Sequence, residues 1–324
     1  MKEVSIEKKD SGQRFDKFLK KYFPGASGGF LYKMLRKKNI ILNGKKAAGD
    51  ELLKEGDRIT VFFSEETFEK MHSPKETPSA NNLFVYQKAF RELKGIEVIL
   101  ELQDVIFLSK PAGILSQSNE TGEPSLNDWL IGYLIKKDEC QDFAVFKPSI
   151  CNRLDRNTSG IVMCGKTYRG SRFLTDCIRN HLLTKKYLAI VEGIPDATFP
   201  VAGELKGYHK KNNNTNRVTI TKEKTDENAA FVHTIYRVIS HDTTHSIAEV
   251  ELITGKSHQI RAHFASIGHP LAGDTKYGGH SYKGKTQQIL HAYQVIFPKF
   301  DEEWKDLSNR VIEAKPPKEF RSFC

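Results

Sequence analysis

The sequence predicts an α+β protein in which a small N-terminal unit precedes a domain built on a mixed, largely antiparallel β-sheet with flanking helices. Its 324 residues are more than one typical domain needs. Strand-like segments outnumber helical ones and do not alternate regularly with them, which argues against a parallel nucleotide-binding fold. Basic residues gather near the N-terminus. We therefore expect an N-terminal unit at 1–63, a linker at 64–95 and a larger domain at 96–324.

The N-terminal unit is expected to hold two short helices and a hairpin. Within residues 14–38, apolar side chains recur at helical spacing on both sides of a break rich in glycine and proline. The apolar run at 40–42 meets Asn43-Gly44, which is a strong signal for a tight hairpin turn. A further strand is predicted at 58–63.

Charge is unevenly distributed along the chain. Residues 1–63 carry fifteen Lys and Arg against eight Asp and Glu, whereas the remaining 261 residues carry 35 against 32. A basic unit joined to a nearly neutral body is typical of a polyanion-binding appendage. A basic surface that only keeps the protein in solution is the alternative.

Residues 11–63 resemble the S-four-like RNA-binding domain in the order, spacing and charge of their motifs. The resemblance rests on Arg14 to Leu19, the second helix, Ile41 to Lys45, and Leu53 to Val61. It implies that the second helix lies along an RNA backbone, where basic side chains neutralise phosphates without reading bases. The residues expected to bind RNA in this way are Arg14, Lys17, Lys33, Arg36, Lys37 and Lys38.

The larger domain begins at residue 96. Residues 64–82 have few apolar positions and several prolines and asparagines, as a linker does, and residues 82–95 are ambiguous. Strands are then predicted at 98–102, 105–108, 161–164, 187–191, 231–239, 247–252 and 290–297. Helices are predicted from a capped start at Ser125, from 168 to 182, and from 257 to 267, where Gly268 ends the last one.

Several classes of protein are excluded by what the sequence lacks. No apolar run approaches the roughly 20 residues of a membrane helix, and the N-terminus has no apolar secretion signal. We therefore expect a cytoplasmic protein that is monomeric. Five cysteines, an odd number without zinc-knuckle spacing, predict reduced thiols and no metal. No glycine-rich phosphate loop is found.

Two segments carry residue types suited to chemistry. In Asn152 to Gly160, the carboxylate Asp155 stands between Arg153 and Arg156 in a segment of loop-forming residues. A nearby cation favours an ionised carboxylate, which suits a nucleophile or an electrostatic stabiliser, although a structural ion pair explains most such patterns.

The second segment runs from Thr254 to His263. Here His258 and Arg261 lie three residues apart and can point at a common partner, so Arg261 is a candidate cation for Asp155. A purely structural role for His258 and His263 is the alternative. A zinc pair is disfavoured by their spacing of five.

Together these segments resemble the RluA-type pseudouridine synthases from about Ile96 to Phe320. The resemblance rests on five ordered motifs: Lys110 to Gly113, Arg153 to Arg156, Lys186-Tyr187, Thr254 to Arg261, and Gly268 to Gly278. The family is also known with an S-four-like domain ahead of this core. The chain departs from the pattern at Asn152, where the family usually has His, and at Lys256, where it usually has Arg. Residues 280–288 look like an extended loop.

The resemblance implies an RNA enzyme that isomerises uridine to pseudouridine without a redox cofactor, ATP or metal. Asp155 would be the catalytic carboxylate, acting on the sugar or on the base. Tyr187 would stack on the base and take part in proton transfer, and Arg261 would pair with Asp155. Arg153 and Arg156 would grip the RNA while the uridine is flipped out of its stack.

The resemblance also favours large-subunit ribosomal RNA as the substrate, because an S-four-like domain commonly accompanies that substrate in the family. Three alternatives remain. These are a synthase acting on transfer RNA, a catalytically inactive RNA-binding or ribosome-assembly protein, and a glycosidase, which would normally need paired carboxylates.

Overall fold

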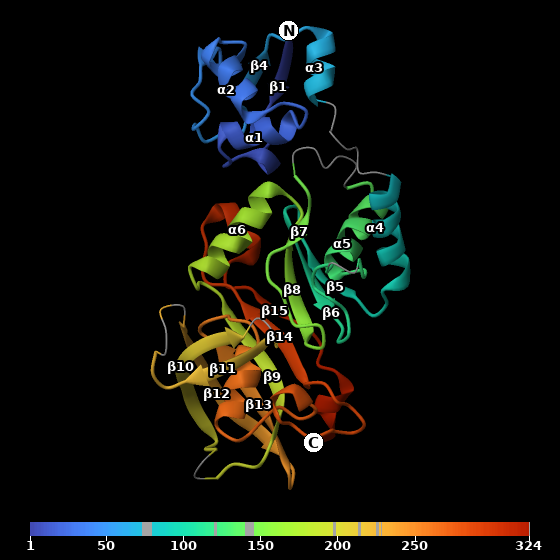
Figure 1. The fold of residues 1–324 in the computed structure, drawn as a ribbon, viewed down its shortest axis with the longest axis vertical. Helices are drawn as coiled ribbons and strands as arrows, with labels where there is room; N and C mark the ends of the chain where they lie inside the picture. Colours follow the sequence, from blue (N-terminus) through green and yellow to red (C-terminus); the bar gives the residue numbers. More distant parts are fainter. Residues whose placement is uncertain are drawn as a thin grey trace.

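The structure, a computed structural model, describes residues 1–72, 80–119, 122–139, 146–196, 199–212, 215–224, 227 and 229–323. These residues form two separate sheets along an elongated molecule, with the N-terminal unit at one end (Figure 1). The larger sheet is mixed and mainly antiparallel, which confirms the predicted fold class for the main body of the chain.

In the N-terminal unit, two helices pack on a four-stranded sheet. The helices are α1 (Phe15–Tyr22) and α2 (Gly28–Arg36). The sheet has the order β1 (Lys2–Ser5), β4 (Arg58–Val61), β2 (Ile40–Leu42) and β3 (Lys45–Lys46). Asn43 and Gly44 have φ angles of 50° and 72°, as a tight hairpin turn between β2 and β3 requires. The strand β1 was not predicted from the sequence.

Residues 64–95 differ from the linker that the sequence predicts, because the described part is largely helical. Helix α3 (Glu65–His72) places Phe68 in the core of the N-terminal unit. Helix α4 (Ala80–Glu92) packs instead on the larger domain, where the Phe90 ring lies 5.5 Å from the ring of Trp129. Apolar anchoring thus extends the first unit to residue 72. Pro74 and Pro78, which suggested a linker, lie outside the described residues.

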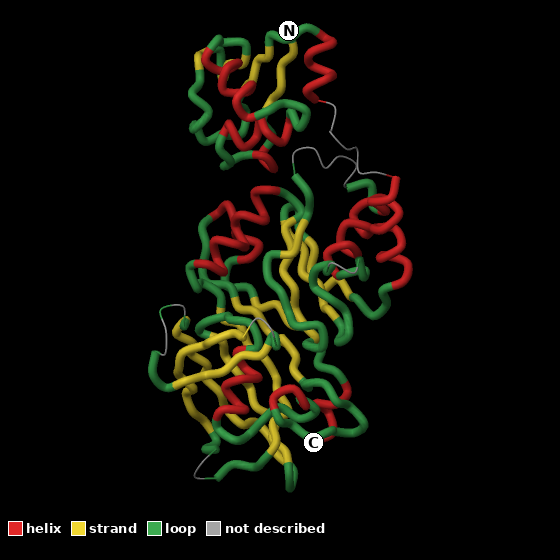
Figure 2. Tube along the Cα trace, viewed as in Figure 1, coloured by secondary structure: helices red, strands yellow, loops and turns green. Residues whose placement is uncertain are grey.

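The larger sheet has eleven strands. Nine follow the order β11 (Arg217–Thr221), β10 (Ala202–Asn212), β12 (Ala230–His241), β13 (His245–Leu252), β9 (Thr184–Glu192), β14 (Leu290–Ile296), β8 (Ser159–Gly165), β6 (Val105–Lys110), β5 (Glu97–Glu101). In addition, β15 (Val311–Glu313) pairs with β14, and β7 (Ser149–Ile150) pairs with β8. Figure 2 shows these strands running through the main body of the molecule.

All seven strands predicted for this domain are present, and four were missed. Strands β7 and β15 are only two and three residues long. Strands β10 and β11 form a hairpin whose outward positions are mostly exposed and polar, so that its sequence lacks the apolar run of a buried strand.

Three helices flank the sheet near its centre. Helix α5 (Leu126–Lys136) begins with the predicted cap, because Ser125 and Asp128 bond to each other's backbone N–H. Helix α6 (Tyr168–Arg179) lies between the sheet and the N-terminal unit (Figure 1). Helix α7 (Gln259–Ser266) packs Ile260 and Phe264 into the core of the sheet. Short 3-10 turns are η1 (Lys8–Asp10), η2 (Thr275–Tyr277), η3 (Glu302–Leu307) and η4 (Lys318–Phe323). Among the described residues, no helix is long and apolar enough to cross a membrane.

The sheet's parallel pair, β8 and β14, depends on one glycine. Gly160 has a φ of 114°, and a Cβ atom there would lie 2.1 Å from the carbonyl oxygen of Ala292 on β14. Only glycine permits so close an approach. This contact fixes where β8 begins, and it therefore fixes the loop that immediately precedes the strand.

Candidate active site

The loop that carries Asp155 is clamped by the last residue of β6. The Nζ of Lys110, which is fully buried, donates to the carbonyl oxygens of Pro111, Ile114 and Arg156 at 3.1, 2.8 and 2.9 Å. Burial lowers the pKa of Lys110 to about 7. Three carbonyl acceptors match the three hydrogens of an ammonium, so these contacts favour the charged form despite the burial.

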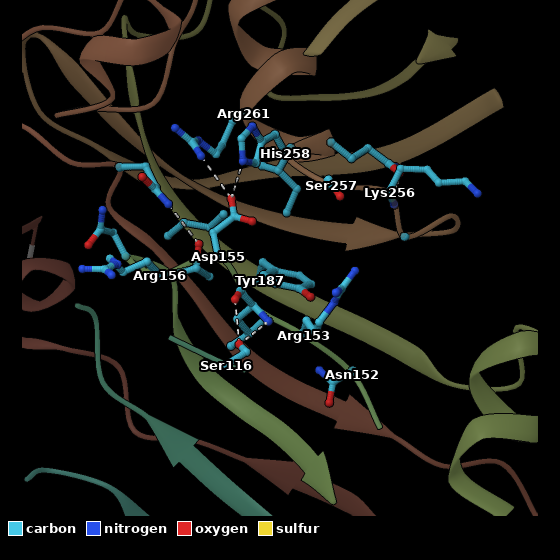
Figure 3. Close-up of a pocket in the computed structure, with 18 of the residues that line it drawn as sticks. Ser116, Asn152, Arg153, Asp155, Arg156, Tyr187, Lys256, Ser257, His258 and Arg261 are labelled. Carbon is cyan, nitrogen blue, oxygen red and sulfur yellow. Dashed lines mark hydrogen bonds and ion pairs between the residues drawn. The ribbon is translucent and has the colours of Figure 1, made fainter. Parts of the chain in front are cut away.

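Ser116 adds a second clamp one residue before Asp155. Its hydroxyl donates to the carbonyl oxygen of Leu154 at 2.7 Å and accepts from the Leu154 N–H at 3.0 Å. Figure 3 shows these bonds directly below Asp155. The backbone on both sides of the carboxylate is therefore fixed before any substrate binds.

Asp155 forms an ion pair with Arg261, as the sequence predicts. The Nη1 of Arg261 donates to Oδ2 of Asp155 at 3.1 Å (Figure 3). The same guanidinium makes two shorter bonds, of 2.7 and 2.8 Å, to the carboxylate of Asp274, which is only 1% exposed. Burial alone lowers the pKa of Arg261, but its bonds to Asp274 and Asp155 raise it overall. Asp274 thus holds Arg261 in the orientation that meets Asp155.

His258 also reaches Asp155. Its Nε2 lies 3.8 Å from Oδ2 of Asp155, and its Nδ1 lies 2.9 Å from the hydroxyl of Tyr277. His258 has a φ of 53° and occupies the N-cap position just before α7, so it does not lie on a face of the helix. Burial lowers the pKa of His258 and outweighs the nearby Asp155, which favours a neutral ring at pH 7.

Tyr187 reaches the same place from the middle of the sheet. It lies on β9, where it pairs with Val250 of β13 and Ala292 of β14, and Figure 3 shows its ring next to Asp155. Burial, with the nearby Asp155 charge, raises the pKa of Tyr187 well above its usual range. The phenol therefore keeps its proton and presents a neutral aromatic face.

These groups open into one cavity of about 820 Å³. Its lining comes from the Asp155 loop, β9, the β10–β11 hairpin, α7 and the segment 274–288. Seven Lys or Arg residues line it, against the two carboxylates Asp155 and Asp274. The cavity is thus large enough for a nucleotide and suited to a polyanion. Within the described ranges, no cluster of three His, Cys, Asp or Glu side chains could hold a metal ion.

The two arginines that flank Asp155 lie on opposite sides of it and are both exposed (Figure 3). Arg156 forms an ion pair with Glu123. Of the two departures from the family pattern, Asn152 is structural, because its Oδ1 accepts from the Met163 N–H at 2.7 Å on β8. Lys256 is exposed at the edge of the cavity.

The loop at 280–288 braces the Asp155 loop, a role that the sequence did not indicate. Asn157 donates to the side-chain oxygen of Gln287 at 2.7 Å, and Gln288 donates to Thr158 at 3.3 Å. Tyr282 is buried in the core beside the sheet. The loop is therefore ordered against the main body.

The basic residues of the N-terminal unit lie outside this cavity, in a separate part of the molecule. Lys17, Lys33, Arg36, Lys37 and Lys38 are exposed on α1, α2 and the turn that follows α2. Arg14 is also exposed and pairs with Asp16 at 3.0 Å. A ligand must be large enough to reach beyond the cavity if it is to contact these residues and the cavity together.

His263 belongs to a buried histidine cluster behind α7 and not to the cavity. It is 1% exposed, and its Nδ1 lies 2.8 Å from the hydroxyl of Thr234. Burial, together with the nearby His209 and His233, lowers the pKa of His263 to about 4. His209 in turn contacts the carbonyl oxygen of Ser257 at 2.9 Å, just before α7. The structural role weighed for His263 is the one that these contacts support.

We expect His263 to make the fold sensitive to acid. Since its folded pKa lies below the unfolded value of 6.5, the unfolded chain binds the proton more readily. Its contribution to stability is complete above pH 6.5 and declines as the pH falls towards 4, at up to about 1.4 kcal/mol per pH unit. Urea unfolding of wild type and His263→Gln across this range measures the difference.

A variant at the exposed His241 serves as the control for that measurement. His241→Gln should keep the pH dependence of the wild type. Parallel stability curves for wild type and His263→Gln between pH 4 and 6.5 would contradict the assignment.

The chain is similar to several known proteins. Residues 104–266 match the RNA pseudouridylate synthase family. The chain is 30% identical over 316 residues to ribosomal large subunit pseudouridine synthase C of Rickettsia bellii. The matched region covers 95% of each chain. The chain is also 29% identical over 303 residues to an uncharacterized RNA pseudouridine synthase of Mycoplasma genitalium. That match covers 91% of this chain and 89% of the other protein.

The chain therefore belongs to the RNA pseudouridylate synthase family and is an RNA pseudouridine synthase of the RluA type, as its motifs indicated. A solved structure, human RNA pseudouridylate synthase domain containing 4, shares its fold. The TM-score is 0.55 at 20% identity, over 75% of this chain and 95% of that one.

Proposed function

We propose that Asp155 is the catalytic carboxylate of the isomerisation, acting on the sugar or on the base of a flipped uridine. The observation that supports this most directly is its ion pair with Arg261, at 3.1 Å, inside a cavity large enough for a nucleotide. In the reaction, the C1′–N1 bond breaks, the base turns, and a C1′–C5 bond forms. The proton on C5 leaves and N1 gains one, so no atom is added or lost overall.

Tyr187 and Arg261 act around that carboxylate. Tyr187 stacks its neutral ring on the uracil and can exchange its proton with the base. Arg261, held by Asp274, keeps the Asp155 oxygen aimed and its charge balanced. Arg153 and Arg156 contact the RNA backbone on the two sides of the cavity. These residues supply the proposed chemistry without a cofactor.

We propose large-subunit ribosomal RNA as the substrate, with transfer RNA as the second candidate. The support is the Rickettsia bellii relative, whose name states that substrate, at 30% identity over nearly the whole chain. The test is incubation of the protein with transcripts of large-subunit ribosomal RNA, small-subunit ribosomal RNA and transfer RNA, followed by mapping of pseudouridine. Modification of transfer RNA alone would overturn the proposal.

We propose further that the N-terminal unit is an S-four-like RNA-binding domain. One support is the pair of helices, with exposed lysines, that packs on a small sheet. The other is its apolar core, in which all the described residues lie between 4 and 71. Such a core indicates a unit that folds by itself. Its RNA contacts would then add to those made at the cavity.

Deletion of residues 1–72 should weaken RNA binding and spare the chemistry. The deletion removes sixteen Lys and Arg and eleven Asp and Glu, but none of the residues that line the cavity. Each lost phosphate contact should flatten the salt dependence of affinity by about 0.7–0.9 log units per log unit of salt. Affinity at several salt concentrations and single-turnover rates at excess enzyme measure both effects.

An equal salt dependence in the full and shortened chains would show that the unit does not touch RNA. A folded but inactive shortened chain would show instead that the unit helps to assemble the active site. A variant of the full chain with Lys33, Arg36 and Lys37 changed to Gln provides the matched test with the unit still in place.

A further inference from the structure

One lysine of the cavity, Lys185, is half-buried and has no ion-pair or hydrogen-bond partner among the described residues. Lys185 lies on β9, two residues before Tyr187 and therefore on the same face of the strand. Its half-buried side chain lines the cavity. In the part of the chain that the structure describes, it makes neither an ion pair nor a hydrogen bond. Burial lowers the pKa of the Lys185 ammonium.

Three cations nearby are already engaged. Lys186, the next residue, faces the other side of the sheet and lies 3.3 Å from Glu249. Lys276 donates to the carbonyl oxygen of Asn216 at 2.8 Å, and Arg261 is held by two carboxylates. The other cavity-lining cations that have no ion pair among the described residues are exposed. Lys185 thus differs from them in being half-buried in the cavity without a counter-charge in the described part of the chain.

An unpaired, partly desolvated ammonium lowers the stability of the free protein. That cost is offset if an anion arrives with the substrate. Gly255 borders the ammonium, because a Cβ atom at this position would lie 3.6 Å from the Lys185 Nζ, an ordinary contact distance.

We propose that Lys185, beside Gly255, forms a binding subsite for the RNA phosphate next to the flipped uridine. Phosphates are the anionic groups that RNA carries, and a phosphate flanks each nucleotide on both sides. Lys185 shares its strand face with Tyr187, so a base stacked on Tyr187 brings one of its phosphates towards the ammonium. This inference rests on the proposed function, in which the uridine binds at Asp155 and Tyr187.

The test compares Lys185→Met with Lys186→Met, its neighbour on the opposite face. The substrate is a short RNA around the mapped uridine, with a neutral methylphosphonate replacing the phosphate on its 5′ or 3′ side. In the wild type, one of the two replacements should weaken binding about 10- to 100-fold, as the loss of a charge-assisted bond does. In Lys185→Met that replacement should have no further effect, and Lys186→Met should behave as the wild type.

The subsite would be overturned if Lys185→Met and each methylphosphonate replacement weakened RNA binding independently, so that their effects on affinity added. Lys185→Arg keeps the charge and should restore the sensitivity to the neutral linkage, which separates loss of the cation from damage to the fold. Melting temperatures of all the variants provide the check on folding.

A second probe does not depend on the RNA target. Uridine 3′,5′-bisphosphate should compete for the wild-type cavity more strongly than uridine, and Lys185→Met should lose most of that difference. If the difference persists in Lys185→Met, the subsite is wrong even where RNA is modified. If it disappears while no RNA is modified, the proposed target has failed and the subsite stands.

Discussion

Asp155→Asn should abolish isomerisation while leaving RNA affinity within a few fold of the wild type. The amide keeps the size and polarity of the side chain but cannot act as a nucleophile or balance a cationic sugar. The backbone around it stays clamped by Lys110 and Ser116, so the fold should survive. We expect single-turnover rates to fall by more than about 10⁴-fold, the scale on which enzymes lose activity without their nucleophile.

Release of tritium from RNA labelled at C5 of uridine measures this rate. The C5 proton leaves only when the new carbon–carbon bond has formed, so the signal reports the complete reaction. Affinity measured by filter binding on the same preparation shows whether the loss lies in chemistry or in binding. Asp50→Asn, at an exposed carboxylate of the N-terminal unit, is the matched control. Appreciable tritium release by purified Asp155→Asn would sink the assignment.

The sequence was enough to locate Asp155 and its partner Arg261. It did not indicate which residues hold the two side chains in place. Asp155 and Arg261 stand in ordered motifs, and the fold brings them to 3.1 Å. Asp274 stands in such a motif too, yet its bond to Arg261 depends on how the segment after α7 turns back on the helix. Lys185 forms no ion pair among the described residues, and the role proposed for it depends on the cavity that the fold builds around it.

The errors in the fold have similar physical causes. The sequence favoured a linker at 64–95 because residues 64–82 have few apolar positions and residues 82–95 are ambiguous, whereas Phe68 and Phe90 pack α3 and α4 against their neighbours. The hairpin β10–β11 was missed because one of its faces meets solvent. Local patterns predict buried elements well, but short or exposed ones depend on contacts made elsewhere in the chain.

Arg261→Met should lower both turnover and stability, for two separable reasons. Without the guanidinium, Asp155 loses its aim and its counter-charge, and we expect single-turnover rates to fall by about 10²–10³-fold, as when one preorganised electrostatic contact is lost. Asp274, 1% exposed, also loses the partner of its two short bonds. An unpaired buried charge of this kind destabilises a fold by about 3–5 kcal/mol. Urea unfolding measures the second effect.

The double variant Arg261→Met/Asp274→Asn separates these effects, because it removes the stranded charge together with its partner. Its stability should recover much of what Arg261→Met loses, while its turnover should stay low, since the Asp155 carboxylate then lacks the Arg261 guanidinium. Asp274→Asn alone should keep the cation but weaken its orientation, and should fall between wild type and Arg261→Met in rate at saturating RNA. If the folded double variant isomerises uridine at nearly the wild-type rate, Arg261 serves only to balance Asp274 and does not position Asp155.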